Sequence, residues 1–247
     1  MNKDTLKGKA VLITGSGSGL GEATAHAFAH AGCWVACIDI NGQAAGQVSR
    51  DLELQGARSI AIQCDVSDAE AVIQTVQMIH GQFKRLDILV NCAAIDYTLS
   101  VDEMTIEQWE QVIAVNLTGP FLFAKAALPL MREQHAGHII NISSTAATRA
   151  WANAAAYHAS KWGLRGFSRA LGVEGRPDGI RVTTIIPGGM RTHFFDRFKE
   201  QGISMPEERN LQDPANVAEV IVCAAMVPPE SVLQEVIITP LTETSWP

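Results

Sequence analysis

The chain has 247 residues, 47% of them hydrophobic and 18% charged, which suits one compact domain with a sizeable core. Its net charge of −7, without a basic run, argues against nucleic acid and against an anionic membrane surface as partners. Five scattered cysteines have neither metal-ligand nor disulfide spacing, and no stretch looks like a signal peptide or a membrane span, so we expect a soluble, cytoplasmic protein without a metal.

Apolar, β-branched runs typical of buried parallel strands alternate with segments of helical periodicity along the whole chain. Seven strands with intervening helices indicate one mostly parallel sheet, with helices on both faces and ligands bound beyond the carboxyl ends of the strands. The expected strands are 10–13, 34–39, 59–65, 87–93, 137–143, 180–187 and 235–240. The expected helices are 22–31, 41–55, 68–82, 105–133, 155–173 and 214–226.

A glycine-rich turn follows the first predicted strand. It reads TGSGSGLG over residues 14–21 and leads into the first predicted helix. Glycines let the backbone turn tightly and approach a pyrophosphate, whose charge is met by free N–H groups and by the positive end of the helix dipole. The spacing is TGxxxGxG, not GxGxxG, and by itself it would be an ordinary tight turn as often as a phosphate site.

Asp39 ends the second predicted strand, on the order of 20 residues past the glycines. An acidic side chain at this place accepts hydrogen bonds from the adenosine ribose hydroxyls, and it repels a 2′-phosphate. No Arg or Lys occupies positions 16–18 or 40–43, where a basic group would receive that phosphate. The sequence therefore favours NAD over NADP as cofactor.

Tyr157 and Lys161 stand four residues apart in a predicted helix, so they share one face of it. A free tyrosine has a pKa of about 10, too high for easy proton abstraction at neutral pH, and a fixed cation nearby favours the phenolate. The pair therefore predicts a proton-transfer device. The same spacing also recurs by chance as a solvated surface pair, so the surrounding motifs have to decide between the two interpretations.

These motifs together resemble the short-chain dehydrogenases/reductases, in their compact form of about 250 residues. The resemblance covers essentially the whole chain: TGSGSGLG at 14–21, Asp39, CDV at 64–66, NCAA at 91–94, Asn116, NISS at 141–144, YHASK at 157–161, and Pro187, Gly188 and Thr192. It implies a single NAD(P)-binding, Rossmann-like domain over residues 1–247, with a doubly wound, parallel, seven-stranded sheet. The unpatterned segment at about 188–212 would be a substrate loop.

The family mechanism, carried onto this sequence, makes Tyr157 the general acid/base and Lys161 the cation that favours its phenolate and binds the nicotinamide ribose. Ser144, 13 residues before Tyr157, would donate a hydrogen bond to the substrate oxygen. Its neighbour Ser143 is the less favoured candidate for that role. Asn116 would interrupt helix regularity and hold a water that links Lys161 to solvent. The resemblance thus implies an NAD(H)-dependent oxidoreductase that interconverts a secondary alcohol and its ketone.

Cofactor contacts also follow from the resemblance, whereas substrate contacts follow only from position. The expected cofactor contacts are Gly15, Ser18, Gly19, Leu20, Gly21, Asp39, Ile40, Cys64, Asp65, Val66, Asn91, Ala93, Tyr157, Lys161, Pro187, Gly188 and Thr192. Asp65 could instead cap the next helix, and Asn91 could merely tie adjacent strands. The candidate substrate contacts are Asp96, Thr98, Ser144, Trp151, His193 and Phe194.

Other features leave the substrate and the assembly open. Ala94 replaces a family glycine, which we expect cofactor binding to tolerate, and the carboxyl end lacks the family's Asp-Gly-Gly. Arg191 or Arg197 could recognise a carboxylate, although surface arginines are the commoner case. The resemblance implies a homotetramer or homodimer, in which aromatic residues of the long helices would be either contacts or core: Trp109, Phe121, Phe123, Trp162 and Phe167.

The sequence favours two other functions less than the oxidoreductase. A non-catalytic dinucleotide-binding regulator would keep the fold without turnover, but the intact set of Asn116, Ser144, Tyr157 and Lys161 weighs against it. A sugar epimerase or dehydratase is disfavoured because those relatives favour TGxxGxxG and longer chains, whereas position 18 here is serine.

Overall fold

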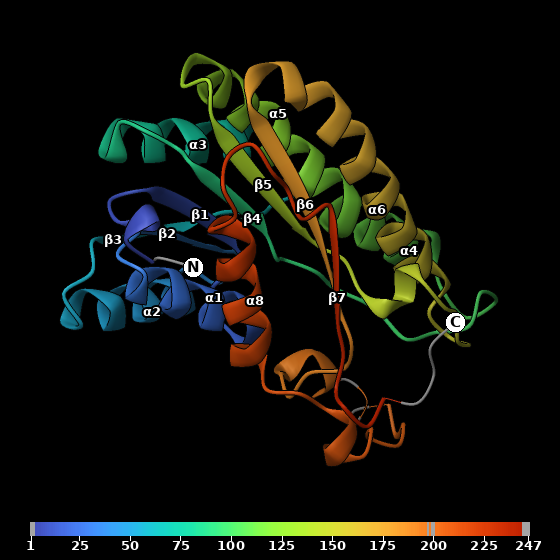
Figure 1. Ribbon diagram of the computed structural model, residues 1–247. Coiled ribbons are helices and arrows are strands. Elements are labelled where there is room, and N and C mark those ends of the chain that lie inside the picture. Colours follow the sequence, from blue (N-terminus) through green and yellow to red (C-terminus); the bar gives the residue numbers. More distant parts are fainter. Residues whose placement is uncertain (1–2, 197, 199–200, 244–247) are drawn as a thin grey trace.

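A computed structural model of the chain describes residues 3–196, 198 and 201–243 (Figure 1). Seven strands form one sheet in the order β3-β2-β1-β4-β5-β6-β7, and every neighbouring pair is parallel. The predicted doubly wound sheet is thus confirmed, and it is parallel throughout. The strands are β1 (Ala10–Thr14), β2 (Trp34–Asp39), β3 (Ser59–Gln63), β4 (Ile88–Asn91), β5 (Gly137–Ile142), β6 (Ile180–Pro187) and β7 (Glu235–Ile238).

Helices cover both faces of the sheet (Figure 1). They are α1 (Gly19–His30), α2 (Gly42–Leu54), α3 (Ala69–Phe83), α4 (Ile106–Ile113), α5 (Gly119–Glu133), α6 (Ala155–Gly175) and α8 (Pro214–Ala225). The boundaries match the predicted ranges closely, except that α1 begins at Gly19 instead of residue 22, because the last glycines of the turn already form its first helical turn.

Alternate residues of the central strand β1 point into two separate cores. Val11 and Ile13 belong to an apolar cluster with residues of α1, α2 and α8. Ala10 and Leu12 belong to a second cluster with residues of α3, α5 and α6 on the opposite face. Because both faces of the sheet are covered, its central strands are apolar on both sides, which is why they appear in the sequence as unbroken apolar runs.

The segment predicted as one helix over 105–133 is interrupted by a π-helical turn. The capping box of Thr105 and Gln108 starts α4, the turn at Ala114–Thr118 follows, and α5 completes the segment. The wider turn directs Asn116 into the interior, where it is 0% exposed. A π-turn of this kind commonly marks a functional position, and here it positions one of the predicted catalytic residues.

By length and composition alone, the stretch Ile106–Glu133 could cross a membrane, so the expectation that no such stretch exists is wrong. Its inward residues Phe123, Ala124, Ala127 and Met131 are buried in the cluster on the sheet. The core helix of a globular domain has this composition for that reason, and the stretch is weak support for a membrane span.

A buried histidine makes the fold sensitive to acid. His138 on β5 is 1% exposed, and its Nε2 lies 2.8 Å from Thr183 Oγ1 on β6. Burial, and then the charge of Arg181, lowers the pKa of His138 from 6.5 to about 3. Between these two values the unfolded chain binds a proton that the folded protein does not, so stability is lost as the pH falls below about 6.5.

We expect His138→Gln to flatten this acid dependence, because glutamine can still bond Thr183 but does not titrate. The wild type should lose about 2 kcal/mol of unfolding free energy between pH 7 and pH 5 through this group alone, and the variant should not. Urea unfolding at the two pH values measures the difference. An equal loss in both proteins would contradict the assignment.

Candidate active site

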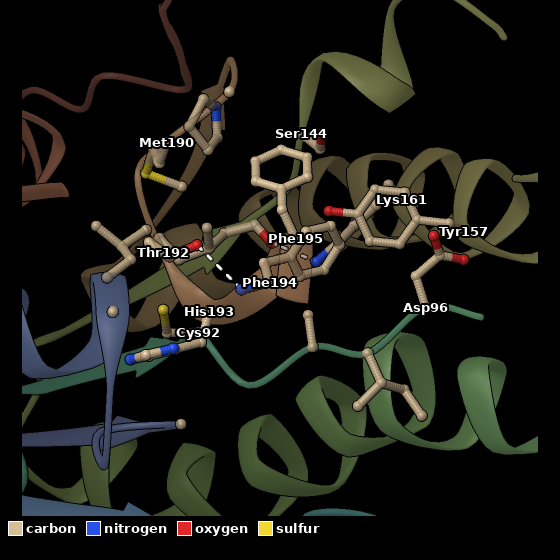
Figure 2. Close-up of a pocket in the computed structure, with 18 of the residues that line it drawn as sticks. Cys92, Asp96, Ser144, Tyr157, Lys161, Met190, Thr192, His193, Phe194 and Phe195 are labelled. Atoms are coloured by element: carbon tan, nitrogen blue, oxygen red, sulfur yellow. Dashed lines mark hydrogen bonds between the residues drawn. The ribbon is translucent and has the colours of Figure 1, made fainter. Parts of the chain in front are cut away.

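A cavity of about 910 Å³ lies beyond the carboxyl ends of the central strands. Parallel α/β sheets bind ligands at this edge, and the volume is at the upper end of the range for small-ligand sites. Its lining includes the glycine turn after β1, the loop after β4, the turn after β5, the start of α6 and the loop after β6. Figure 2 shows Ser144, Tyr157 and Lys161 around it, with Phe194 and Phe195 nearby.

Most residues predicted for the site are brought together in this cavity. Its lining includes Gly15, Ser18, Gly19, Leu20, Gly21, Asp39, Ile40, Cys64, Asp65, Val66, Ala93, Asp96, Thr98, Ser144, Trp151, Tyr157, Lys161, Pro187, Gly188, Thr192, His193 and Phe194. Asn91 and Asn116 are absent from that lining, and their hydrogen bonds explain why.

The glycine turn leaves no room for side chains at its key positions. Gly15 has φ +68°, and a Cβ there would lie 2.8 Å from the Cα of Ala93. Gly19 has φ +57°, and a Cβ there would lie 3.2 Å from Thr192 Cγ2. Ser18 is the N-cap of α1 but makes no side-chain cap hydrogen bond. The turn therefore leaves the start of α1 to an anionic ligand, which fits the pyrophosphate of a dinucleotide.

Asp39 is held rigidly beside this turn. Its Oδ2 accepts a hydrogen bond from Gly17 N at 2.9 Å, and its Oδ1 accepts one from Asn41 N at 2.8 Å. The basic residues in the described lining of the cavity are Arg149, Lys161 and His193, none of them in the segments around Asp39. The carboxylate thus faces the cavity without a neighbouring cation from β2 or the glycine turn.

Asp65 does not cap the next helix. Its Oδ1 accepts hydrogen bonds from Ser67 N at 2.9 Å and from Ser67 Oγ at 2.7 Å. The N-cap of α3 is Asp68, whose side chain accepts from two backbone N–H groups. Asp65 therefore lines the cavity through a turn of its own, and the adenine contact predicted for it stays a prediction.

Tyr157 and Lys161 share one face of α6, as their spacing predicts. The Nζ of Lys161 lies 5.6 Å from the centroid of the Tyr157 ring and donates a hydrogen bond to Ile142 O at 2.9 Å. Lys161 is 2% exposed, and burial lowers its pKa to about 8. A buried ammonium group is thus anchored to the end of β5, beside the phenol.

The two serines after β5 have different roles. Ser144 lines the cavity, and its Oγ accepts a hydrogen bond from Ala146 N at 3.1 Å, which fixes the short turn Thr145–Ala147. Ser143 is 2% exposed, and its Oγ donates to Lys161 O at 3.2 Å. Ser144 therefore has the better placement for a substrate oxygen, whereas Ser143 ties β5 to α6.

Asn116 does not line the cavity, but its hydrogen bonds hold two segments that do. Its Oδ1 accepts from Ile95 N and its Nδ2 donates to Ile95 O, each at 2.8 Å. The same Nδ2 lies 3.1 Å from Ser160 Oγ, and that hydroxyl donates to Tyr157 O at 2.8 Å. Asn116 thus connects the loop after β4 to the helix that carries Tyr157. No pattern in the sequence indicates that Ser160 takes part in this connection.

Asn91 ties strands together, which was the alternative interpretation of this residue. Its Nδ2 donates to Asn141 Oδ1 at 2.8 Å, and Asn141 Nδ2 donates to Ser168 Oγ on α6 at 2.8 Å. Asn91 is 3% exposed. A buried polar network therefore connects β4, β5 and α6. A contact of Asn91 with the cofactor stays a prediction.

Described residues of the loop after β6 line the cavity. The ring of Phe194 lies 5.4 Å from that of Tyr157, and Gln201 Nε2 donates to Tyr97 O at 2.9 Å. Arg191, a candidate for carboxylate recognition, instead donates to Leu211 O at 2.8 Å within the loop, and Arg197 is outside the described residues. The loop therefore shields the phenol with aromatic side chains.

Two predicted substrate contacts form a pair after β4. Thr98 Oγ1 donates to Asp96 Oδ2 at 3.0 Å. Thr98 has φ +52°, a left-handed conformation that is strained for a β-branched residue. The surrounding loop must hold this strain, which fits a role in orienting the Asp96 carboxylate.

The rim on the other side of the cavity contains the predicted Trp151, together with an ion pair that the sequence does not predict. Trp151 N donates to His158 Nε2 at 3.1 Å, and His158 Nδ1 lies 2.8 Å from Ala146 O. This histidine therefore stabilises the rim and has no catalytic role. Arg149 and Glu243 form an ion pair and both line the cavity. The position of Arg149 shortly after Ser144 in the sequence is a signal that it lies at the cavity, but no local pattern indicates Glu243.

Within the described part of the chain, no group of three or more His, Cys, Asp or Glu side chains is arranged to hold a metal ion. The five cysteines are all free. Burial raises the pKa of Cys92, which lines the cavity, to about 12, so this thiol stays protonated at neutral pH.

Comparisons with known proteins agree with this geometry. The sequence profile of the family described as short chain dehydrogenase matches residues 9–202. The chain is 37% identical to D-threitol dehydrogenase of Mycolicibacterium smegmatis, over 74% of this chain and 70% of the relative. It is 37% identical to 2,5-dichloro-2,5-cyclohexadiene-1,4-diol dehydrogenase of Sphingobium indicum, over 86% of this chain and 87% of the relative. It also resembles a metagenomic short-chain oxidoreductase solved in complex with NADP, with a TM-score of 0.84 and 29% identity. The match covers 96% of this chain and 98% of the solved one.

Proposed function

The chain belongs to the short-chain dehydrogenase/reductase family, and on that premise we propose that it is an NAD(H)-dependent oxidoreductase that interconverts a secondary alcohol and its ketone. The observation that carries the proposal is the meeting of Ser144, Tyr157 and Lys161 with the glycine turn in one cavity. A proton-transfer group and a dinucleotide site are the two parts that such a reaction needs. The non-catalytic alternative is not favoured, since the similar curated proteins are named dehydrogenases.

Each catalytic side chain has a task that its position supports. The Tyr157 hydroxyl takes the proton of the substrate hydroxyl during oxidation and returns it to the carbonyl oxygen during reduction. The charge of Lys161, 5.6 Å from the ring, favours the phenolate. Ser144 donates a hydrogen bond to the same substrate oxygen and stabilises the charge that develops on it.

The residues of the cavity fit a nicotinamide dinucleotide. The glycine turn and the start of α1 would hold the pyrophosphate, Asp39 the adenosine ribose, and Asp65 with Val66 the adenine. Pro187, Gly188 and Thr192 would hold the nicotinamide end. When bound, the nicotinamide ring accepts or supplies the hydride.

Asp39 should select NAD over NADP, because its carboxylate repels a 2′-phosphate. A relative with the same fold was solved in complex with NADP, so the proposal attributes the preference for NAD to Asp39 and not to the fold. We expect Asp39→Asn to shift the ratio of kcat/KM for NAD over NADP by roughly 100-fold towards NADP, as expected when a like-charge repulsion is removed. Absorbance at 340 nm with each cofactor measures the ratio. A wild-type protein that prefers NADP would contradict the assignment.

The substrate is proposed as a small neutral alcohol. Relatives are named for different substrates, among them D-threitol, a cyclohexadienediol and a 3-oxoacyl-[acyl-carrier-protein], so membership of the family does not fix it. Around Tyr157 the cavity combines an aromatic wall of Phe194 and Trp151 with the polar pair of Asp96 and Thr98. A panel of secondary alcohols and polyols with NAD tests this proposal.

We also place the protein in the cytoplasm as a homodimer or homotetramer. Three aromatic side chains on α4, α5 and α6 support the assembly, since Trp109, Phe121 and Trp162 are 41%, 45% and 49% exposed. Phe123, by contrast, is a core residue with 0% exposure. We expect Phe121→Glu to weaken association, seen as a lower mass in sedimentation velocity. A wild-type protein that sediments as a monomer of 26.6 kDa would contradict the proposal.

A further inference from the structure

The segment that follows β7, residues 239–243, forms part of the cavity wall. After β7 it passes directly over Gly188, where a Cβ would lie 2.9 Å from Pro240 Cδ and 3.0 Å from Glu243 Oε2. A turn in which Glu243 N donates to Pro240 O at 2.9 Å directs Glu243 back toward the cavity. Thr242 Oγ1 donates to Arg209 O at 2.5 Å, which joins the segment to the loop after β6. Thr242 and Glu243 both line the cavity.

Glu243 meets a cation that is fixed to the catalytic turn. Arg149 N donates to Thr145 O at 3.1 Å, within the turn that Ser144 caps. The guanidinium of Arg149 pairs with the Glu243 carboxylate and lies 6.0 Å from the centroid of the Trp151 ring. The two side chains are 23% and 15% exposed, so water screens the pair only partly. The ion pair therefore lines the same cavity as Ser144, and the backbone of Arg149 is bonded to the turn that Ser144 caps.

Electrostatics determines what this pair does to a substrate. An arginine in a partly desolvated wall is a bidentate receptor for a carboxylate or phosphate. Glu243 neutralises it through the contact of its Oε1 with Arg149 Nη2, the nitrogen with which a substrate carboxylate would also pair. We propose that Glu243 is a specificity-determining residue, which makes the cavity select neutral alcohols and reject those that carry a carboxylate. The inference rests on the proposed function for its turnover test, but not for its binding test.

The turnover test uses two substrates that differ by one charge, 3-hydroxybutyrate and its methyl ester, with NAD. We expect the wild type to prefer the ester, and Glu243→Gln to raise the kcat/KM ratio of acid to ester by roughly tenfold or more, since it leaves the guanidinium without this counter-charge. The double variant Arg149→Gln with Glu243→Gln should return the ratio to the wild-type value. Glu230→Gln, which removes a charge from an exposed position outside the cavity lining, should not change it.

The binding test needs no turnover. Isothermal titration with NADH present measures the affinities for benzoate and for benzyl alcohol. The affinity for benzoate relative to benzyl alcohol should rise in Glu243→Gln, and it should not rise in the double variant. If the alcohols are not oxidised but benzoate binding responds in this way, the inference stands and the proposed function fails. An unchanged acid-to-neutral ratio in Glu243→Gln, in a protein whose thermal melting shows that it is folded, would overturn the inference.

Discussion

Tyr157→Phe should lower kcat for alcohol oxidation by about 10³-fold, within the range that general acid–base catalysis contributes. The substitution removes only the phenolic oxygen, and the ring keeps its place 5.4 Å from Phe194. The glycine turn and Asp39 are untouched, so the affinity for NADH should stay within about threefold of the wild type, far less than the tenfold that 1.4 kcal/mol would produce. Stopped-flow turnover and quenching of protein fluorescence by NADH measure the two quantities separately.

The chain provides a matched control, because it contains just two tyrosines. Tyr97 bonds Gln111 and is absent from the described lining of the cavity. Tyr97→Phe should therefore keep turnover close to that of the wild type. If Tyr157→Phe turned over normally, the acid/base assignment would be wrong, and a non-catalytic dinucleotide-binding protein would become the better explanation.

The parts of the site that the sequence predicts correctly depend on short-range geometry. Residues four apart on a helix must share a face, so Tyr157 and Lys161 meet whatever the rest of the fold does. A glycine turn between a buried strand and a helix must lie at the carboxyl edge of a parallel sheet. The sheet itself, with its seven strands, follows from the alternation of apolar runs and helical periods along the chain.

The parts that the sequence does not predict depend on contacts between distant segments. Glu243 reaches Arg149 because the segment after β7 turns over Gly188, and no local pattern encodes that path. The apolar period over 105–133 predicts an uninterrupted helix, and only the family resemblance indicates the interruption at Asn116 that the π-turn makes. For Asn91 the sequence leaves a cofactor contact and a tie between strands open, and the pairing of β4 with β5 supplies Asn141 as the partner of its buried amide.

Lys161→Met should remove most of the turnover, by roughly 10²- to 10⁴-fold, because the phenolate loses its neighbouring cation. The same change should make the cofactor-free protein more stable at pH 7. Lys161 is a buried ammonium whose pKa is lowered from 10.5 to about 8 by burial, so the folded state holds its proton less tightly than the unfolded chain. Methionine removes that penalty, while loss of the bond to Ile142 O offsets part of the gain, so we expect a net increase of about 1–2 kcal/mol.

The pH dependence of this stability difference identifies its cause. Below pH 8 both states of the wild type bind the proton, so the penalty of the buried charge is fully present. Between pH 8 and 10.5 only the unfolded chain binds it, so wild-type stability rises with pH and the advantage of the methionine variant shrinks. Urea unfolding of both proteins at pH 7 and pH 9.5 measures the change, with Lys7→Met as the control for loss of an exposed lysine. A methionine variant that is less stable than the wild type at pH 7 would show that the ammonium group stabilises the fold, contrary to the burial argument.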